Sequence, residues 1–485
     1  MISPMTQCIR RTLLWCALSA LTGCAVGPDY QRPAIGAPAQ FKELQDWKEA
    51  EPRDEAPRGK WWERYGDSQL NTLVEQVEVS NQNVSAAEAQ YRQAQAVLGA
   101  ARATYFPIVS GNVSASRGQG ASGTSGTTSS NGTVSSAGTA IRNTDRLALG
   151  ASWEVDVWGR IGRGVESSAA AAQASAADLQ AALLSAQATL VQTYLQLRFN
   201  DAQRRLLDDT VVAYERSLAI TRNRYAAGVA ARIDVAQAET QLKSTQAQAI
   251  DLGVQRAQLE HAIALLVGKA PADFSLPPSE MLPALPPIPV GLPSALLERR
   301  PDVAAAERRV AAANAQIGVA QAAFFPALTF SASGGYQGSS LSQLLSLPNR
   351  FWSLGPALAL TLFDAGGRSA LKEQAIAGYD KSVATYRQAV LTAFQDVEDS
   401  LVSLRILAEE AGVQREAAQF AAESLRLTEN QYRSGTVSYL NVVTAQAAGL
   451  SAERSSIDIA GRRMLASAAL LKALGGDWPV AGSPK

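Results

Sequence analysis

The amino-acid sequence predicts a mixed α and β fold, in which long helices and two β-hairpins form an internal two-fold repeat. Three observations lead to this prediction: a recurring order of segments, long stretches without proline, and short stretches in which polar and apolar residues alternate. The order recurs after about 210 residues, far beyond the roughly 20 to 50 residue period of solenoids, which indicates duplication of a whole helix and hairpin unit.

Matching landmarks mark the two copies. The first copy contains Tyr105-Phe106-Pro107, Trp158-Gly159-Arg160 and a break at residues 224–228, and the second contains Phe324-Phe325-Pro326, residues 364–368 and a break at residues 431–435. The expected divisions are a leader at 1–23, an N-terminal segment at 24–66, a first repeat at 67–270 with a hairpin at 108–158, a connector at 271–292, a second repeat at 293–474 with a hairpin at 327–364, and a tail at 475–485.

The first residues read as a secretory leader. Arg10 and Arg11 precede an apolar core at residues 12–21 that is too short to anchor the chain as a helix. Cys24 follows small residues in the pattern of a bacterial lipoprotein cleavage site. We therefore expect Cys24 to become the mature N-terminus and to carry acyl chains, in which each buried methylene contributes about 0.8 kcal/mol to membrane attachment. Apart from this covalent lipid on Cys24, no cofactor is expected.

Cysteine content and charge exclude several classes of protein. All three cysteines lie in the first 24 residues, so the mature chain is expected to fold without a disulfide. The chain has 44 basic residues (Lys and Arg together) and 44 acidic residues (Asp and Glu together), so its formal net charge is zero. This balance argues against a nucleic-acid partner. No window offers the roughly 18 continuous apolar residues that a spanning helix requires, so a chain that crosses a bilayer would cross it as strands.

Proline separates the long helices from the connector. No proline occurs between Pro107 and Pro271 or between Pro356 and Pro479, whereas the segment from Pro271 to Pro293, both included, contains eight. An interior proline costs a helix about 3 kcal/mol, so the proline-free stretches can be long helices and the cluster is an extended connector. The stretch at 160–222, rich in Ala, Gln and Leu, would reach on the order of 90 Å as one helix. A fibrous coiled coil would explain these helical stretches equally well.

The alternating stretches are what a coiled coil does not explain. Residues 146–158 and 352–362 place apolar side chains on one face and small or polar ones on the other, and weaker alternating partners precede them at 108–117 and 327–336. Each stretch is near the roughly 9 to 11 residues that a tilted membrane strand needs. A soluble hairpin with one wet face is the other interpretation of this pattern.

Loop length and strand number favour the membrane interpretation. Residues 118–138 are almost wholly Gly, Ser, Thr and Ala, and residues 337–349 form a shorter counterpart, as expected of loops at one end of a barrel. Four strands cannot close a barrel, and lipid does not tolerate open strand edges, so the barrel would be shared between copies of the chain. Two copies would supply eight strands around a filled interior, and three would supply twelve around a wider one, which the small inward residues suit.

Four motifs resemble the lipoprotein branch of the outer-membrane efflux protein family, also called outer membrane factors, over the whole mature chain. They are Gly27-Pro28-Asp29-Tyr30 with Pro33, Trp61-Trp62-Glu63-Arg64-Tyr65 with Asp67 and Leu70, Leu296-Leu297-Glu298-Arg299-Arg300-Pro301-Asp302-Val303, and Ala473-Leu474-Gly475-Gly476-Asp477-Trp478. Members of this family are the exit ducts of tripartite drug-efflux systems.

The resemblance implies a homotrimer in the outer membrane of a Gram-negative bacterium, anchored by lipid and extending into the periplasm. Each chain would contribute four strands to a transmembrane β-barrel of twelve, and helices to a long periplasmic tube. A belt around the tube would come from the segment after Cys24, the connector and the tail. The implied partners are a periplasmic adaptor (membrane fusion) protein, an inner-membrane pump that is expected to be driven by protons, and outer-membrane lipid.

The two breaks in the helical runs are candidate docking tips. Gly228 and Gly435 suit left-handed C-caps, so both breaks are expected to be tight turns between helices. By resemblance, these turns would contact a hairpin of the adaptor. The candidate contact residues are Arg224, Tyr225, Gly228, Tyr432, Arg433 and Gly435.

Asp234 and Asn441 follow the two turns at equivalent repeat positions and are candidate residues of a periplasmic gate, together with Thr444. By resemblance, acidic rings narrow this end of the tube, and three copies of Asp234 would place like charges close together. Asn441 and Thr444 stand where the family commonly has aspartates, which leaves the charge of the gate open. A solvated helix residue is the other interpretation of Asp234.

The sequence shows no catalytic constellation and no transition-metal site, so we expect a passive duct for small molecules such as drugs, fed by a partner that supplies the energy. Two other interpretations remain: an outer-membrane duct for type I protein secretion, and a periplasmic helical scaffold lipoprotein without a pore.

Overall fold

The computed structural model describes residues 26–34, 59–120, 140–279, 283, 285–286 and 300–476. The predicted leader, Cys24, most of the loop at 118–138, part of the connector and residues 477–485 lie outside the described residues. The chain forms two compact units, each of which takes segments from both repeats. The first unit consists of the described residues within Met1–Arg32, Gln93–Ala172 and Arg308–Val383. The second unit consists of the described residues within Pro33–Arg92, Gln173–Glu307 and Ala384–Lys485.

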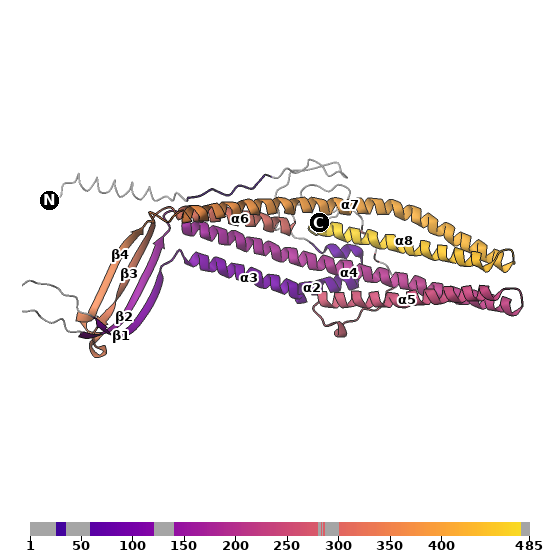
Figure 1. Cartoon of the computed structure of the whole chain (residues 1–485), viewed down its shortest axis with the longest axis horizontal. Coiled ribbons are helices and arrows are strands. Elements are labelled where there is room, and N and C mark those ends of the chain that lie inside the picture. The colour runs from indigo at the N-terminus through magenta and orange to yellow at the C-terminus, as the bar shows by residue number, and fades with distance from the viewer. Residues whose placement is uncertain are drawn as a thin grey trace, which may run out of the picture. The chain divides into compact units, whose positions relative to one another are not determined.

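The first unit contains one antiparallel sheet of four strands (Figure 1). In spatial order these are β1 (Ile108–Gly120), β2 (Ala140–Val155), β3 (Ala327–Gly338) and β4 (Arg350–Ala359). β2 and β3 come from different repeats, and their pairing joins the two hairpins. The pairing runs from Val155 opposite Leu328 to Asp145 opposite Gly338. Within the described part of the chain, β1 and β4 each pair with one neighbour, so the sheet has two open edges.

The loop between β3 and β4 is built from two short 3-10 helices, Leu341–Gln343 and Leu347–Asn349. The side-chain amide of Asn349 donates to the carbonyl of Gln343 at 2.8 Å and fastens the second helix to the first. This loop therefore holds its own shape through local hydrogen bonds.

Proline and aspartate set the boundaries between helix and strand. α3 (Gln82–Ala103) and α6 (Pro301–Ala322) end just before Pro107 and Pro326, because a proline disfavours helical geometry in the preceding residue. β2 ends at Val155 because the carboxylate of Asp156 accepts hydrogen bonds from the amides of Ile161 and Gly162 and so caps the next helix.

Two junctions between helix and central strand, the one from β2 to α4 and the one from α6 to β3, are also bonded to each other. The indole Nε1 of Trp158 donates to the carbonyl of Pro326 at 2.8 Å. The indole ring stacks on Phe325 with ring centroids 4.8 Å apart. These contacts fix the start of the helix after β2 against the start of β3.

Helix lengths confirm the internal two-fold repeat and the mixed α and β class. α4 (Arg160–Ala226) and α7 (Gly367–Arg433) each have 67 residues, and α5 (Arg232–Leu266) and α8 (Tyr439–Ala473) each have 35. α3 and α6 have 22 residues each. No helix within the described residues has the length and apolar character needed to cross a membrane.

The second unit is built around a core that the N-terminal segment completes. A 3-10 helix at Trp61–Tyr65 and α2 (Ser68–Ser80) supply buried aromatic and aliphatic side chains, which pack against α4, α5 and α8. Asp67 caps α2 by accepting from the amides of Gln69 and Leu70 at 2.9 and 3.1 Å. Its second oxygen accepts from the hydroxyl of Tyr194 on α4 at 2.6 Å, so the cap also fastens α2 to the long helix.

Another 3-10 helix, Pro271–Asp273, follows α5 at the start of the connector. Arg256 donates to the carbonyl of Leu276, and the carboxylate of Glu260 accepts from the amide of the same residue. Arg198 donates to the carbonyl of Pro277 at 3.0 Å. Charged side chains of α4 and α5 therefore hold the first part of the connector.

Candidate functional site at the helical tips

The two predicted tips are matching turns in the second unit. One joins α4 to α5 and the other joins α7 to α8, as Figure 1 shows for each helix pair. Gly228 and Gly435 have φ angles of 75° and 80°, where a side chain would be strained. The amide of Val229 donates to the carbonyl of Arg224, and that of Thr436 to Gln431. Both turns are therefore Schellman caps, in which glycine is the left-handed residue.

Arg224 connects the two tips. Its Nη1 donates to the carbonyls of Tyr432 and Arg433, at 2.8 and 3.1 Å, and its guanidinium lies over the ring of Tyr432, 4.6 Å from the centroid. These carbonyls are at the C-terminus of α7, where helical partners are missing and positive charge is favoured. The equivalent position in the second repeat holds Gln431, so the bridge runs in one direction only.

The six candidate docking residues divide into two groups. Tyr225, Gly228, Arg433 and Gly435 are exposed, whereas Arg224 is half-buried and Tyr432 is buried. Tyr432 packs edge-on against Tyr439 with ring centroids 5.2 Å apart, in a small apolar core between the two helix pairs. The first group can meet a partner directly, and the second holds the surface in place from within.

The gate candidates follow the turns, as the sequence places them. The carboxylate of Asp234 accepts from the amide of Ala231 at 3.2 Å and so caps the start of α5. The hydroxyl of Thr444 donates to the carbonyl of Leu440 at 2.9 Å. Asn441 is exposed near the start of α8. Asp234 is thus the one candidate of the three with a charge, and part of that charge serves the helix terminus.

Glu239 holds the arms of the first tip together. It accepts from Arg222 at 2.7 Å and lies 3.8 Å from Arg232. The hydrogen bond from Arg222, more than the charge of Arg232, lowers the pKa of Glu239 below its usual value. The α4–α5 tip is thereby stiffened independently of Arg224.

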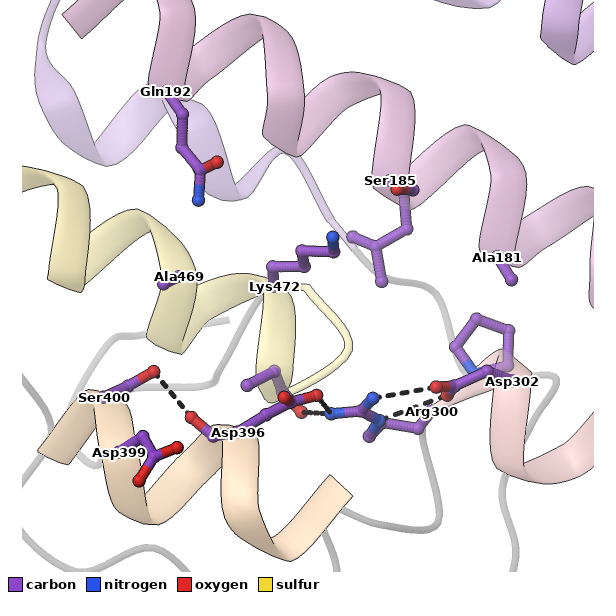
Figure 2. Close-up of a pocket in the computed structure, with 13 residues that line it drawn as sticks. Ala181, Ser185, Gln192, Arg300, Asp302, Asp396, Asp399, Ser400, Ala469 and Lys472 are labelled. Atoms are coloured by element: carbon purple, nitrogen blue, oxygen red, sulfur yellow. Dashed lines mark hydrogen bonds and ion pairs between the residues drawn. The ribbon is translucent and has the colours of Figure 1, made fainter. Parts of the chain in front are cut away.

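A second polar cluster lines a cavity of about 530 Å³ in the same unit (Figure 2). The buried Arg300 forms ion pairs with Asp302 at 2.8 Å and Asp396 at 2.9 Å, and its Nη1 donates to the carbonyl of Ala473 at 3.4 Å. It therefore ties the start of α6 to α7 and to the end of α8. Lys472 extends across the cavity toward Ser185 on α4.

Burial acts to raise the pKa of Asp302, but hydrogen bonds from Arg300 and its positive charge outweigh burial, so the pKa lies below its usual value. The joint has an uncharged counterpart in the first repeat. There Asn81, which also precedes a helix, donates to the carbonyl of Leu266 at the end of α5 at 2.8 Å. The same helix ends are thus joined by an amide in one repeat and by an arginine in the other.

Sequence reasoning assigned no role to these polar residues. Arg300 appeared only within a family motif, and the charged group of Arg198, Asp201, Arg256 and Glu260 was not singled out. One signal could have identified Arg198, which stands between Leu197 and Phe199 in a stretch, residues 179–200, that contains no other charged residue. A charged residue in such a stretch needs buried partners.

Within the described residues, no group of three or more His, Cys, Asp or Glu side chains could hold a metal ion. The candidate sites are surfaces and joints between helices.

Comparison with known proteins gives a consistent result. The family model described as "Outer membrane efflux protein" matches residues 73–269 and 292–476. The chain is 30% identical over 473 residues to the antibiotic efflux pump outer membrane protein ArpC of Pseudomonas putida, which covers 96% of each chain. It is 28% identical over 477 residues to the cation efflux system protein CusC of Escherichia coli, and this alignment covers 98% of this chain and 100% of CusC. The solved structure of the outer-membrane channel OprN superposes with a TM-score of 0.85 at 31% identity, and covers 94% of this chain and 100% of OprN.

Proposed function

Because the chain belongs to the outer membrane efflux protein family, it is an outer-membrane channel of an efflux pump, and we propose that it works as a lipid-anchored homotrimer. In this proposal the trimer is a passive duct rather than an enzyme. It passes small molecules from an inner-membrane pump and its periplasmic adaptor to the exterior.

The open edges of the sheet carry the proposal. β1 and β4 are the edge strands, and each has one neighbour within the described residues. Their exposed apolar side chains include Val113, at 80% exposure, and Trp352, at 75%. An apolar sheet whose edges are unpaired is unstable in lipid, because each free backbone group costs several kcal/mol. Pairing β4 of one copy with β1 of the next would satisfy both edges, and three copies would make a twelve-stranded barrel.

An apolar stripe on α7 supports the same assembly. Ile406, Val413, Phe420 and Leu427 recur every seven residues, which places them near one face of the helix. All four are exposed, Val413 at 72% and Phe420 at 69%. A row of this kind is typical of a helix that packs lengthwise against another helix. A second copy of the chain is the partner that the open sheet edges also require.

The tips support adaptor docking and gating. Tyr225, Gly228, Arg433 and Gly435 form the exposed part of the two turns, and we assign the adaptor contact to them. Arg224 and Tyr432 hold the turns in register. Three copies of Asp234 would form a ring of negative charge just inside the tips, which Asn441 and Thr444 would not reinforce.

Lipidation at Cys24 would add a second attachment to the outer membrane beside the barrel, since several acyl chains tether a protein firmly. ArpC and CusC are described as efflux components for antibiotics and cations, so relatives of similar sequence serve very different solutes. We therefore assign the choice of substrate to the pump, which is expected to be proton-driven, and assign none to the duct.

Single-channel recording in a planar bilayer tests the proposal. Purified protein whose mass in detergent corresponds to three chains should give stable channels. Protein that inserts as a folded trimer and stays silent would favour a scaffold without a pore. An adjacent gene for an export ATPase, in place of a proton-driven pump, would favour protein secretion.

The α7 stripe gives a separate test of the trimer. Phe420→Asp should reduce the trimer fraction, because each interface would lose about 2 kcal/mol of apolar burial and gain a charge. Gln419→Asp, at an exposed position beside the stripe, is the matched control and should assemble normally. Mass measurement in detergent would decide between them, and equal trimer fractions would exclude the stripe from the interface.

A further inference from the structure

The residues that follow the expected lipidation site are held against α4 and α6 of the first unit by specific contacts. Val26–Asp29, named here the strap, crosses the start of α4 and the middle of α6. The amide of Val26 donates to the carbonyl of Trp158 at 3.1 Å, and the side-chain amide of Asn314 donates to the carbonyl of Pro28 at 2.9 Å. Backbone hydrogen bonds thus hold the strap at both ends.

A close approach of two glycines allows the strap to lie on α6. A Cβ added to Gly27 would come within 2.5 Å of the Cα of Gly318, and Gly27 has a φ of 113°. A Cβ on Gly318 would come within 2.8 Å of the Arg163 side chain and 3.1 Å of the carbonyl of Val26. Neither position has room for a side chain, so the strap is in backbone contact with the helix.

Arg163 closes the site from the side of α4. Its side chain is 8% exposed, and it forms an ion pair at 2.8 Å with Asp29 of the strap and another at 2.8 Å with Glu166. It also lies 3.4 Å from the carbonyl of Gly27. We name Trp158, Arg163, Asn314 and Gly318 the strap site.

The strap site lies on the helices that continue the two central strands. β2 runs into α4 through Trp158, and α6 runs into β3 through Phe325 and Pro326. The Trp158 indole already bonds these two junctions to each other. Only Ala25 separates Val26 from Cys24 in the sequence. A force on lipid attached to Cys24 would therefore pass through the strap to the paired central strands.

We propose that the strap and the strap site couple the lipid anchor to the β2–β3 strand pair, so that lipidation positions both hairpins for entry into the outer membrane. This inference rests on the proposed lipid-anchored channel. It assigns Arg163, Asn314 and Gly318 as positioning residues that act in membrane insertion and have no part in conduction.

Docking of the strap is tested by hydrogen exchange of the Val26 amide in the purified channel. Asn314→Ala and Gly318→Ala should speed its exchange by about tenfold, the change expected from losing a hydrogen bond or its geometry. The matched controls are Gln316→Ala, which removes an α6 side chain bonded to Ser167, and Gly164→Ala, whose added Cβ meets nothing within 4 Å. Exchange that is equally fast in the unsubstituted channel would overturn the docking.

Coupling is tested by combining Asn314→Ala with removal of the lipid. Replacing the leader with a cleavable secretory signal and Cys24 with Ala gives the unlipidated chain. Asn314→Ala should lower the urea-resistant, membrane-inserted trimer severalfold in the lipidated chain, and should change it little in the unlipidated one. Equal losses in both backgrounds would indicate a purely structural role, and no loss in the lipidated chain would refute the coupling.

Conductance separates this inference from the proposed function. Asn314→Ala trimers that do insert should conduct as the unsubstituted trimers do. If no inserted trimer conducts, with or without the substitution, the channel assignment itself fails. If all conduct and insertion is unchanged, only the coupling fails.

Discussion

At the scale of single residues, Arg224 is the main difference between the two tips. It spans from one helix pair to the other through two hydrogen bonds and a ring contact, while Gln431 stands at its position in the second repeat. A chain with two identical tips would have had two such bridges. The tips are therefore joined within a chain by one charged side chain.

Arg224→Ala should loosen this join by about 2 kcal/mol, the usual size of hydrogen bonds from a charged donor. We expect trimers with a higher conductance in planar bilayers, because the helix pairs can separate more easily at the tip. Arg222→Ala, which breaks a link within one tip, is the control and should change conductance less. An unchanged conductance for Arg224→Ala would show that the bridge does not limit opening.

Asp302 gives the joint at Arg300 a dependence on pH. Its pKa is lowered in the folded chain, so its contribution to stability is present above the unfolded pKa of about 3.9 and is lost as pH falls through the folded value. Asp302→Asn should therefore lower the thermal midpoint at pH 7. The effect should be about 1 kcal/mol, because the half-exposed carboxylate is screened.

The difference from the unsubstituted protein should shrink as the pH falls below about 3.9, and it should close once the pH is below the lowered folded pKa of Asp302, where the carboxylate is protonated in both states. Asp399→Asn changes a carboxylate of the same cavity that accepts from Gln395, and serves as the control. A deficit of the same size at pH 3 and pH 7 would contradict the role of this charge.

At the scale of elements, the pairing of β2 with β3 unites the two repeats. Gly335 lies opposite Ala148 in this pairing, and a Cβ at Gly335 would come within 2.7 Å of the Ala148 Cα and collide with the Leu147 carbonyl. The central seam of the sheet therefore depends on a missing side chain.

Gly335→Ala should push β3 away from β2 and reduce the heat-resistant, barrel-containing form of the protein. Gly355→Ala on β4 is a matched control, because a Cβ there meets nothing within 4 Å. The expected loss is about 1 to 3 kcal/mol for the first substitution and close to zero for the second. Gel mobility before and after heating would measure both, and equal mobility shifts would contradict a close seam at Gly335.

The strands and helices could be predicted from local pattern, because alternation with period two and the absence of proline are visible in a short window. The structure extends β2 back to Ala140 and ends it at Val155, before the predicted residue 158. The end is set by the capping carboxylate of Asp156, whose hydrogen bonds reach residues in the following helix. The alternating pattern favours a strand that continues past Asp156, whereas the helix cap requires the strand to end before it. The alternating pattern alone does not show which of the two determines the boundary.

At the scale of the whole molecule, the repeat and the fold class could be predicted, but the polar joints could not. Arg198, Arg256 and Arg300 meet partners that lie far away in the sequence, such as Pro277, Asp201 and Asp396. Periodicity says which face of a helix is apolar, and it does not say which carbonyl or carboxylate will face a buried arginine. The strap site was missed for the same reason.

A substitution at one tip should separate insertion from transport. Gly435→Pro should spare membrane insertion, because the turn lies in the second unit and the strands in the first. It should impair efflux, since proline cannot adopt the φ of 80° at this position and cannot donate the amide hydrogen bond to Tyr432. Normal drug resistance at normal abundance would count against the tip assignment.

The equal lengths of α4 and α7, at 67 residues each, limit how such a chain can evolve. One residue inserted into either helix would turn everything beyond it by about 100° and advance it by about 1.5 Å. Its turn would then lose register with the other turn, and the guanidinium of Arg224 would no longer meet the end of α7. Changes of helix length should therefore survive in natural variants as compensated pairs, one in each half of the gene.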